Sequence, residues 1–223
     1  MQRALGAVAL VLLGIVVLVA IFGPLLTPYD PNTSSLQQIL APPSAEHILG
    51  GDGAGRDVLS RLISATQISI AAALVALITS AAIGITAGLI AGYYRGWFDG
   101  LASWMTSVTM ALPGIVVILA ARAVLGPSVW LAMIIFGVLI SPGFYRLVYA
   151  TVSGVREELY VDAARVSGLS DTRIIGRHIL SVVRAPIIIQ SAMVMGIAIA
   201  VLSGLEFLGL GDINVPTWGS MLN

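Results

Sequence analysis

The sequence of 223 residues contains neither cysteine nor lysine, so its positive charge comes from arginine alone. The absence of cysteine excludes a disulfide framework, a thiolate nucleophile and a cysteine-ligated zinc or iron–sulfur site. Only 10% of the residues are charged, 58% are hydrophobic, and the mean hydropathy is +0.99. Because so little polar surface cannot cover a water-soluble domain of this size, the composition predicts an integral membrane protein.

The missing lysine also decides how a glycine-rich stretch at residues 50–57 is interpreted. Its glycine spacing is that of a phosphate-binding loop, but Arg56 and Asp57 stand where that loop needs lysine and serine or threonine. We therefore expect a tight external loop and no bound nucleotide. The formal net charge of zero gives no basic field for nucleic acid. No motif of a hydrolase or a metal site is present, so we expect neither an enzyme nor a cofactor.

Five charge-poor stretches are long enough to cross the hydrocarbon core, which takes about 20 residues of helix. They are residues 4–26, 68–92, 101–125, 129–145 and 185–205. The first has a longer apolar run than a signal peptide and no small-residue cleavage pattern, which favours an uncleaved anchor. The chain is therefore predicted to be an all-α polytopic helical bundle.

The arginines predict the orientation of these spans. If the N-terminus is inside, most arginines between the spans lie on the inner side and only Arg56 and Arg61 lie outside. The positive-inside rule then favours a multi-pass protein with its N-terminus and its 150–184 loop in the cytoplasm. We divide the chain into residues 1–67, an anchor helix with an external loop, and residues 68–223, a transmembrane core that includes this cytoplasmic loop.

The loop between the fourth and fifth spans is polar and has the pattern of a docking surface. The acids Glu157 and Glu158 favour the start of a short helix, and Gly168 suits the left-handed position that ends it. Tyr160, Ala163 and Ala164 follow at i, i+3 and i+4, which gives one helix face an aromatic ring beside two small residues. We expect this face to enter a groove of a partner protein.

A row of arginines follows in the next helix. Arg173, Arg177 and Arg184 fall within about 40° of one another at 100° per residue. Anionic lipid headgroups are the favoured partner of this row, and a partner protein is the alternative.

Two spans have small residues at every fourth position, a spacing that lets helix backbones approach closely in lipid. They are Ala72, Ala76, Ser80, Gly84, Gly88 and Gly92 in the second span, and Ala192, Gly196, Ala200 and Gly204 in the fifth. For the second span, packing within the chain is favoured over a subunit interface. For the fifth span, the two interpretations are equally favoured.

Four residues in the spans are candidates for a translocation path: Pro113, Arg122, Gln190 and Glu206. Pro113 should kink the third span, either as a packing device or as a hinge. Arg122 lies near the outer end of that span, where it can snorkel to the interface, and a substrate carboxylate is its less favoured partner. Glu206 is equally consistent with a path residue and with a solvated residue at the interface.

Several motifs occur in the order typical of one family. They are HILG at residues 47–50, GRDVLSR at 55–61, DAARVSG at 162–168, FLGLG at 207–211 and WGSML at 218–222. On these motifs the chain resembles the permease subunits of bacterial ABC importers, and more narrowly the dipeptide, oligopeptide and nickel permease family. Asp162 replaces the family's usual glutamate and Ser181 a proline. Relatives continue into another helix, so a sixth span is expected beyond Asn223.

The resemblance implies the fold of an ABC type I importer permease in the bacterial cytoplasmic membrane. It implies a second homologous permease, cytoplasmic ATPase subunits and an extracytoplasmic substrate-binding protein as partners, with membrane lipid around the spans. The cargo would be di- or oligopeptides, with nickel or a metal chelate as the alternative and an ATP-independent secondary transporter as a weaker one. The residues implied in coupling to the ATPase are Tyr160, Asp162, Ala163, Ala164, Gly168 and Leu169.

Overall fold

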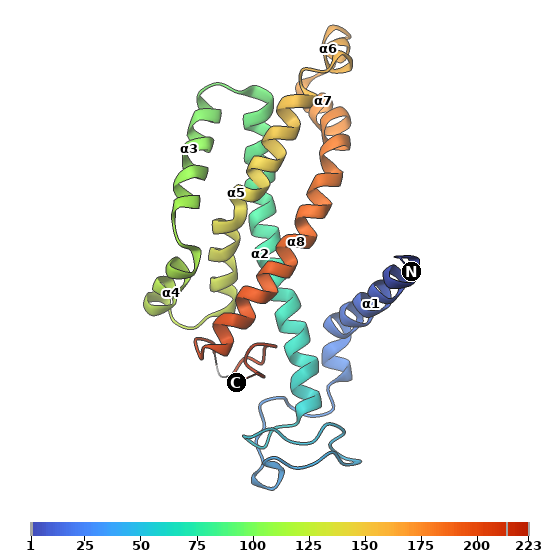
Figure 1. Ribbon diagram of the computed structural model, residues 1–223, viewed down its shortest axis with the longest axis vertical. Coiled ribbons are helices and arrows are strands. Elements are labelled where there is room, and N and C mark those ends of the chain that lie inside the picture. Colours follow the sequence, from blue (N-terminus) through green and yellow to red (C-terminus); the bar gives the residue numbers. More distant parts are fainter. Residues whose placement is uncertain (1, 213, 223) are drawn as a thin grey trace. The chain divides into compact units, whose positions relative to one another are not determined.

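The structure is a computed structural model that describes residues 2–212 and 214–222, and over these residues every named element is a helix. The elements are α1 (Gln2–Leu26), the 3-10 turn η1 (Leu36–Gln38), α2 (Val58–Tyr94), α3 (Trp97–Ala111), α4 (Gly114–Leu125), α5 (Val129–Val155), α6 (Leu159–Val166), α7 (Asp171–Ile174), the π-helical turn η2 (Ile175–Ile179) and α8 (Leu180–Phe207) (Figure 1). The predicted all-α class is confirmed. Asn223, after which a sixth span is expected, lies outside the described residues.

Within residues 2–212 and 214–222, four helical stretches are long and apolar enough to cross a membrane. They are Gly6–Leu26 of α1, all of α2, all of α5, and Asp171–Phe207, in which α7, η2 and α8 are continuous. These stretches contain the second, fourth and fifth predicted spans and all but two residues of the first. At 1.5 Å per residue, the 37 residues of α2 reach about 55 Å, well beyond a hydrocarbon core of about 30 Å. The helix therefore extends into the polar region.

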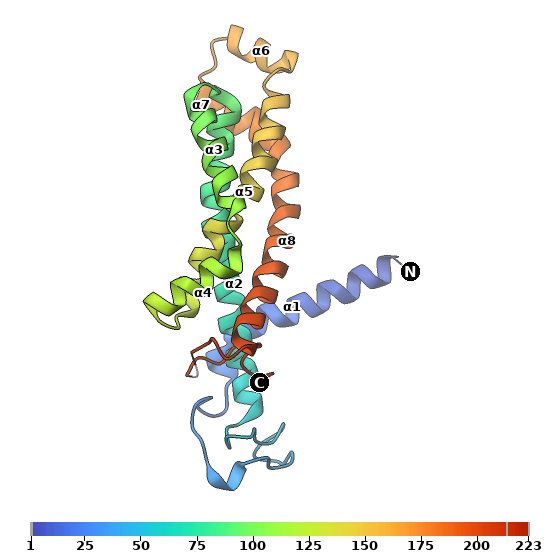
Figure 2. The same ribbon diagram turned by 60° about the vertical axis from the view of Figure 1, so that its left-hand side comes forward.

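The third predicted span, residues 101–125, is not one kinked helix. α3 ends at Ala111, α4 begins at Gly114, and the two helices are bent by 80° (Figure 2). Pro113 is the residue that precedes α4, and Leu112 before it is extended, with φ −82° and ψ 130°. A proline lacks the N–H that would continue the helix and disfavours a helical residue before it, so the expected kink is a full break.

The close approach of α2 to α5 explains the row of small residues in the second span. A Cβ atom on Gly84 would lie 2.5 Å from both the Phe144 Cβ and the Ser141 carbonyl oxygen. A Cβ on Gly88 would lie 2.9 Å from the Tyr145 carbonyl oxygen. Only hydrogen fits in these gaps, so packing within the chain is confirmed for this row.

The chain forms two compact units, residues 1–73 with 199–223 and residues 74–198. In the first unit, Gly50 and Gly55 take left-handed φ values of 74° and 73° and so make a tight loop. The Asp52 Oδ1 atom accepts hydrogen bonds from the N–H groups of Ala54 and Arg56, both at 2.9 Å. The loop's own carboxylate thus uses backbone donors of the kind that a phosphate would need.

Asp57 joins this loop to the start of α2. Its Oδ2 atom accepts hydrogen bonds from the Ser60 N–H at 2.7 Å and the Ser60 hydroxyl at 2.6 Å, and its Oδ1 atom is 2.9 Å from His47 Nδ1. Burial raises the pKa of Asp57, but the bonds from Ser60 and His47 outweigh it and hold the pKa below the ordinary value of 3.8. The ionised carboxylate therefore stabilises the folded loop.

We expect the Gly84→Ala substitution to destabilise the protein by about 1–3 kcal/mol, because the added methyl group must displace backbone and Cβ atoms of α5. The thermal unfolding midpoint in detergent measures the effect. Gly196→Ala in α8 is the matched control, because a Cβ atom there meets nothing within 4 Å. Equal midpoints for the two variants would contradict the close contact of α2 with α5.

The lowered pKa of Asp57 predicts a loss of stability in acid. The group's contribution is fully present above its unfolded-state pKa of 3.8 and declines as the pH falls through the lower, folded-state value. Between about pH 5 and about pH 3, the unfolding midpoint should therefore fall further in the wild type than in an Asp57→Asn variant. Parallel pH profiles would show that Asp57 does not stabilise the loop.

Candidate functional site

The loop between α5 and α7 contains α6, which starts after Glu158 and is closed by a glycine. Gly168 has a φ of 79°, the left-handed conformation predicted for it. Its N–H donates to the Arg165 carbonyl at 2.9 Å, and the N–H of Leu169 donates to the Ala164 carbonyl at 3.1 Å. These paired bonds form a Schellman motif, so the end of α6 is a defined turn.

The inner side of α6 belongs to a hydrophobic core. Val161 is fully buried, Ala164 is 8% exposed, and Leu169 packs at the margin of the cluster. The other buried members are Tyr93, Val148, Val152, Val155, Ile174, Ile179 and Val183. These residues come from α2, α5, α7, η2 and α8, and α6 and α7 lie at the same end of α5 (Figure 1). The loop is therefore seated on the helix ends.

The outer side of α6 is apolar but exposed. Leu159 is 85% exposed, Val166 is 91% exposed, and Tyr160 and Ala163 are also exposed. Leu159, Ala163 and Val166 stand at i, i+4 and i+7, so they form one stripe along the helix. We call these three residues and Tyr160 the outer face of α6. Exposed apolar side chains in a row on a polar loop are typical of a contact surface for a partner.

The predicted face of Tyr160, Ala163 and Ala164 is therefore wrong at one position. Ala164 points into the core, where it lies one turn after the buried Val161. Its small side chain lets α6 approach the helices beneath it. The i, i+4, i+7 spacing of the outer face was the sequence signal that identifies the exposed side, and sequence reasoning missed it for Leu159 and Val166.

Polar contacts attach the loop to the end of α2. The Tyr93 hydroxyl, on a side chain only 3% exposed, donates to Asp171 Oδ1 at 2.6 Å. The Arg165 guanidinium carbon lies 5.4 Å from the centroid of the Tyr93 ring, a cation–π distance. Asp162 pairs with Arg165 at 3.2 Å, but this exposed i, i+3 pair contributes only about 0.2–0.5 kcal/mol. Tyr93 is thus the central contact, and sequence reasoning missed it.

The helix after the loop contains the π turn η2, which lies between Arg173 and Arg184 along the chain. A π turn accommodates more residues than an α turn, so the 100° step used for the prediction fails across it. Arg173, Arg177 and Arg184 are all exposed. The single row of arginines stays a prediction.

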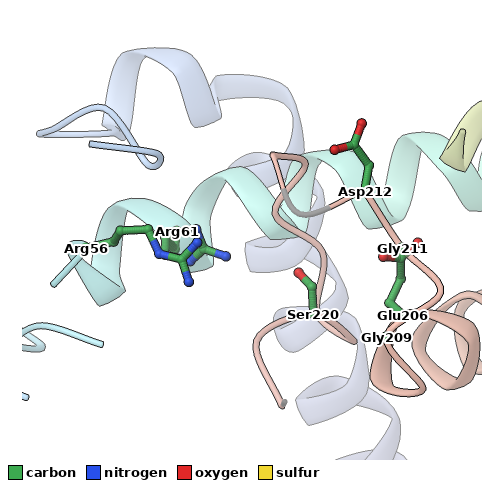
Figure 3. A pocket seen from close by; sticks show the side chains of 7 residues that line it. All are labelled: Arg56, Arg61, Glu206, Gly209, Gly211, Asp212 and Ser220. Carbon is green, nitrogen blue, oxygen red and sulfur yellow. The ribbon is translucent and has the colours of Figure 1, made fainter. Parts of the chain in front are cut away.

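A cavity lies at the other candidate site, within the unit of residues 1–73 and 199–223. It has a volume of about 170 Å³, and the charged side chains on its wall are Arg56, Arg61, Glu206 and Asp212 (Figure 3). Glu206 is only 2% exposed. Its interpretation as a solvated interface residue is therefore wrong, while its role in a translocation path stays a proposal.

The other candidates for the path are spread over several helices. Pro113 is exposed at the break between α3 and α4. Arg122, in the last turn of α4, is half-buried and lies beside Leu131 near the start of α5. Gln190 of α8 lies against Gly143 of α5, with its Nε2 atom 3.1 Å from the position of an added Cβ. Arg122 and Gln190 thus lie beside different stretches of α5.

A polar cluster between α3 and α5 also escaped sequence reasoning. The Tyr149 hydroxyl donates to Asp99 Oδ2 at 2.9 Å, the Ser103 hydroxyl donates to Asp99 Oδ1 at 3.1 Å, and the Tyr145 and Ser103 hydroxyls are 2.9 Å apart. Asp99 is the only acidic residue between positions 58 and 156. An isolated acid in so apolar a region was the available signal, because a carboxylate that is partly removed from water needs hydrogen-bond donors.

The long apolar helices define a polytopic membrane protein. Residues 84–223 match the family model of the binding-protein-dependent transport system inner membrane component, and residues 1–43 match the N-terminal TM domain of oligopeptide transport permease C. The chain therefore belongs to the family of binding-protein-dependent transport system inner membrane components.

Individual relatives agree with this assignment. The chain is 39% identical over 223 residues to the dipeptide transport system permease protein DppC of Alkalihalophilus pseudofirmus. The matched region covers 100% of this chain and 73% of that protein. It is 35% identical over 211 residues to the glutathione transport system permease protein GsiD of Pectobacterium atrosepticum, and the match covers 94% of this chain and 70% of that protein. A putative peptide transport system permease protein of Brucella suis is 37% identical over 223 residues, with 100% and 75% covered.

We expect Gly168→Ala to destabilise the loop, because a left-handed conformation costs a residue with a Cβ atom about 1–2 kcal/mol. The rate of proteolytic cleavage within residues 157–170 measures the opening of the loop. Gly154→Ala near the end of α5 is the matched control, since its added Cβ meets nothing within 4 Å and alanine favours a helix. Cleavage as slow in the Gly168 variant as in the control would refute the capping role.

Proposed function

We propose that the chain is the permease subunit of an ATP-driven importer that moves short peptides through a bacterial cytoplasmic membrane by alternating access. The observation that carries this proposal is the outer face of α6, an exposed apolar surface on a loop that the hydrophobic core holds in place. The similar permeases are named for dipeptide, glutathione and peptide transport, which supports a peptide cargo. Nickel is not favoured as the cargo.

The proposed role of α6 is to couple ATP hydrolysis to movement in the membrane. Its outer face would enter a groove of a separate ATPase subunit, while Val161 and Ala164 on its inner side contact the core. A displacement of α6 by the ATPase subunit would therefore also displace the core residues that contact its inner side. The bond from Tyr93 to Asp171 extends this contact to the end of α2.

A second permease of similar fold is the partner proposed within the membrane. The small residues of the fifth span, at positions 192, 196, 200 and 204, are all exposed, and a Cβ atom on Gly196 or Gly204 meets nothing within 4 Å. The opposite side of α8 is buried through Val194, Ala198 and Leu202. Because small residues let helices approach in lipid, this open row supports a subunit interface over packing within the chain.

The distribution of arginine supports the proposed orientation, with the N-terminus and α6 in the cytoplasm. In this orientation the outer face of α6 lies on the side where ATP is available. The loop with Gly50 and Gly55 lies outside, where a substrate-binding protein would deliver the cargo.

We expect the double substitution Leu159→Ser and Val166→Ser to weaken binding of the ATPase subunit at least tenfold. Burial of each side chain is worth about 1.5–3 kcal/mol, and about 1.4 kcal/mol corresponds to a factor of ten. Copurification of the ATPase subunit and ATP-dependent uptake of labelled dialanine in membrane vesicles are the measurements. Both should fall together.

Ile48→Ser is the matched control for this experiment. Ile48 is 62% exposed, but it lies in the loop before α2 and not in α6. This variant should retain the ATPase subunit on copurification. Normal uptake by the double variant, at wild-type protein levels, would refute the coupling role of the outer face.

A further inference from the structure

The cavity in the unit of residues 1–73 and 199–223 is lined by charges of both signs, which the coupling role of α6 does not explain. Its two basic residues come from the loop before α2 and the first turn of that helix, and its two acids come from the end of α8 and the segment after it. Figure 3 shows the two arginine side chains close together and the Ser220 side chain between them and Glu206. The wall therefore has a basic side and an acidic side.

The basic side is held rigidly. The Arg56 Nε atom donates to Asp52 Oδ2 at 2.9 Å, and the Arg61 Nε atom lies 3.5 Å from the same oxygen. Arg61 Nη1 also donates to the Pro31 carbonyl at 3.2 Å, and its side chain is only 4% exposed. One carboxylate thus serves two guanidinium groups, which leaves this side of the cavity with a net positive charge.

The acidic side is shaped by a glycine. A Cβ atom on Gly211 would collide with Glu206 Oε2, so only glycine allows the carboxylate to occupy this position. Glu206 is nine-tenths or more buried, and Asp212 next to Gly211 is half-buried. The segment that contains Ser220 is attached to α2 through Trp218, whose Nε1 donates to Thr66 Oγ1 at 3.0 Å. The fold thus holds both sides of the cavity in place.

The charges limit the chemistry of a ligand. A simple anion such as phosphate would meet the carboxylates of Glu206 and Asp212, and a metal cation would meet two guanidinium groups. A zwitterion satisfies both sides, with its carboxylate facing the arginines and its ammonium group facing the acids. At about 30 Å³ per water, a cavity of about 170 Å³ holds the equivalent of about five or six waters, comparable to a dipeptide.

We infer that this cavity binds a short zwitterionic peptide, with its α-carboxylate toward Arg56 and Arg61 and its α-ammonium group toward Glu206 and Asp212. The inference rests on the proposed peptide cargo and adds to it a binding site in the permease itself. Free termini at both ends, and not the side chains of the peptide, would be the recognised features. Side-chain variety would then be tolerated at this site.

The test measures peptide binding to the complete membrane complex, permeases with ATPase, in lipid nanodiscs without the substrate-binding protein. Isothermal titration uses dialanine, N-acetyl-dialanine and dialanine amide as probes. We expect each blocked peptide to bind wild type at least about tenfold more weakly than dialanine, because each lacks one charge-assisted contact. Equal affinities for the three probes, or no binding of dialanine, would overturn the inference.

Two substitutions assign the contacts. Glu206→Gln keeps the size of the side chain and should abolish the preference for dialanine over the N-acetyl form, while the preference over the amide remains. Arg56→Gln should abolish the preference for dialanine over the amide, while the preference over the N-acetyl form remains. Glu46→Gln, an exposed acid outside the cavity, is the control and should change neither preference. If Glu206→Gln prevents assembly of the complex, Asp212→Asn serves in its place, and an unchanged preference in the assembled variant refutes the assignment.

Uptake by the complete wild-type transporter separates this inference from the proposed function. ATP-dependent uptake of dialanine in the presence of the binding protein, together with equal affinities for the three probes, would leave the function in place and exclude the site. The absence of peptide uptake would refute the function itself.

Discussion

The contact between the backbones of α2 and α5 is the constraint on which the unit of residues 74–198 depends. Lipid provides little hydrophobic drive for two apolar helices to associate, so their attraction comes from dispersion between closely spaced atoms. Gly84 and Gly88 allow that spacing because a Cβ at either position would collide with α5. The same contact brings Tyr93, at the end of α2, beside Val152 and Val155 of α5, where α6 is seated.

In the coupling that we propose, the two sides of α6 have different tasks, and a helix of eight residues can serve both only because its apolar residues are divided between them. Val161 and Ala164 attach it to the chain, while Leu159 and Val166 remain uncovered. A connecting loop without the inner contacts would absorb a partner's movement in its own flexibility. A loop without the outer face would offer the partner little surface. The Schellman turn at Gly168 fixes the direction in which the chain leaves, so both sides keep their orientation.

The features that were predictable from the sequence are those set by local chemistry. The apolar stretches, the left-handed Gly168 and the intrachain role of the row at Gly84 follow from composition, backbone sterics and spacing. The errors arise where tertiary packing decides between similar local options. A small residue such as Ala164 fits equally well against a partner's groove and against the chain's own core. Only the neighbouring core residues show that it points inward. The position of Glu206 at the end of a span does not decide whether its side chain is buried or exposed. Its place in a cavity depends on residues 56–61, more than a hundred positions earlier.

The π turn at Ile175–Ile179 has a mechanical consequence for the helix that contains it. Such a turn is an α-helix with surplus backbone, and the surplus can pass along the helix by exchange of one hydrogen bond at a time, without melting it. Each such step would twist everything N-terminal to the turn against everything C-terminal to it, as in a ratchet. In the coupling that we propose, the polypeptide between Asp171 and Leu180 is thus the place for a torsional joint between α6 and α8.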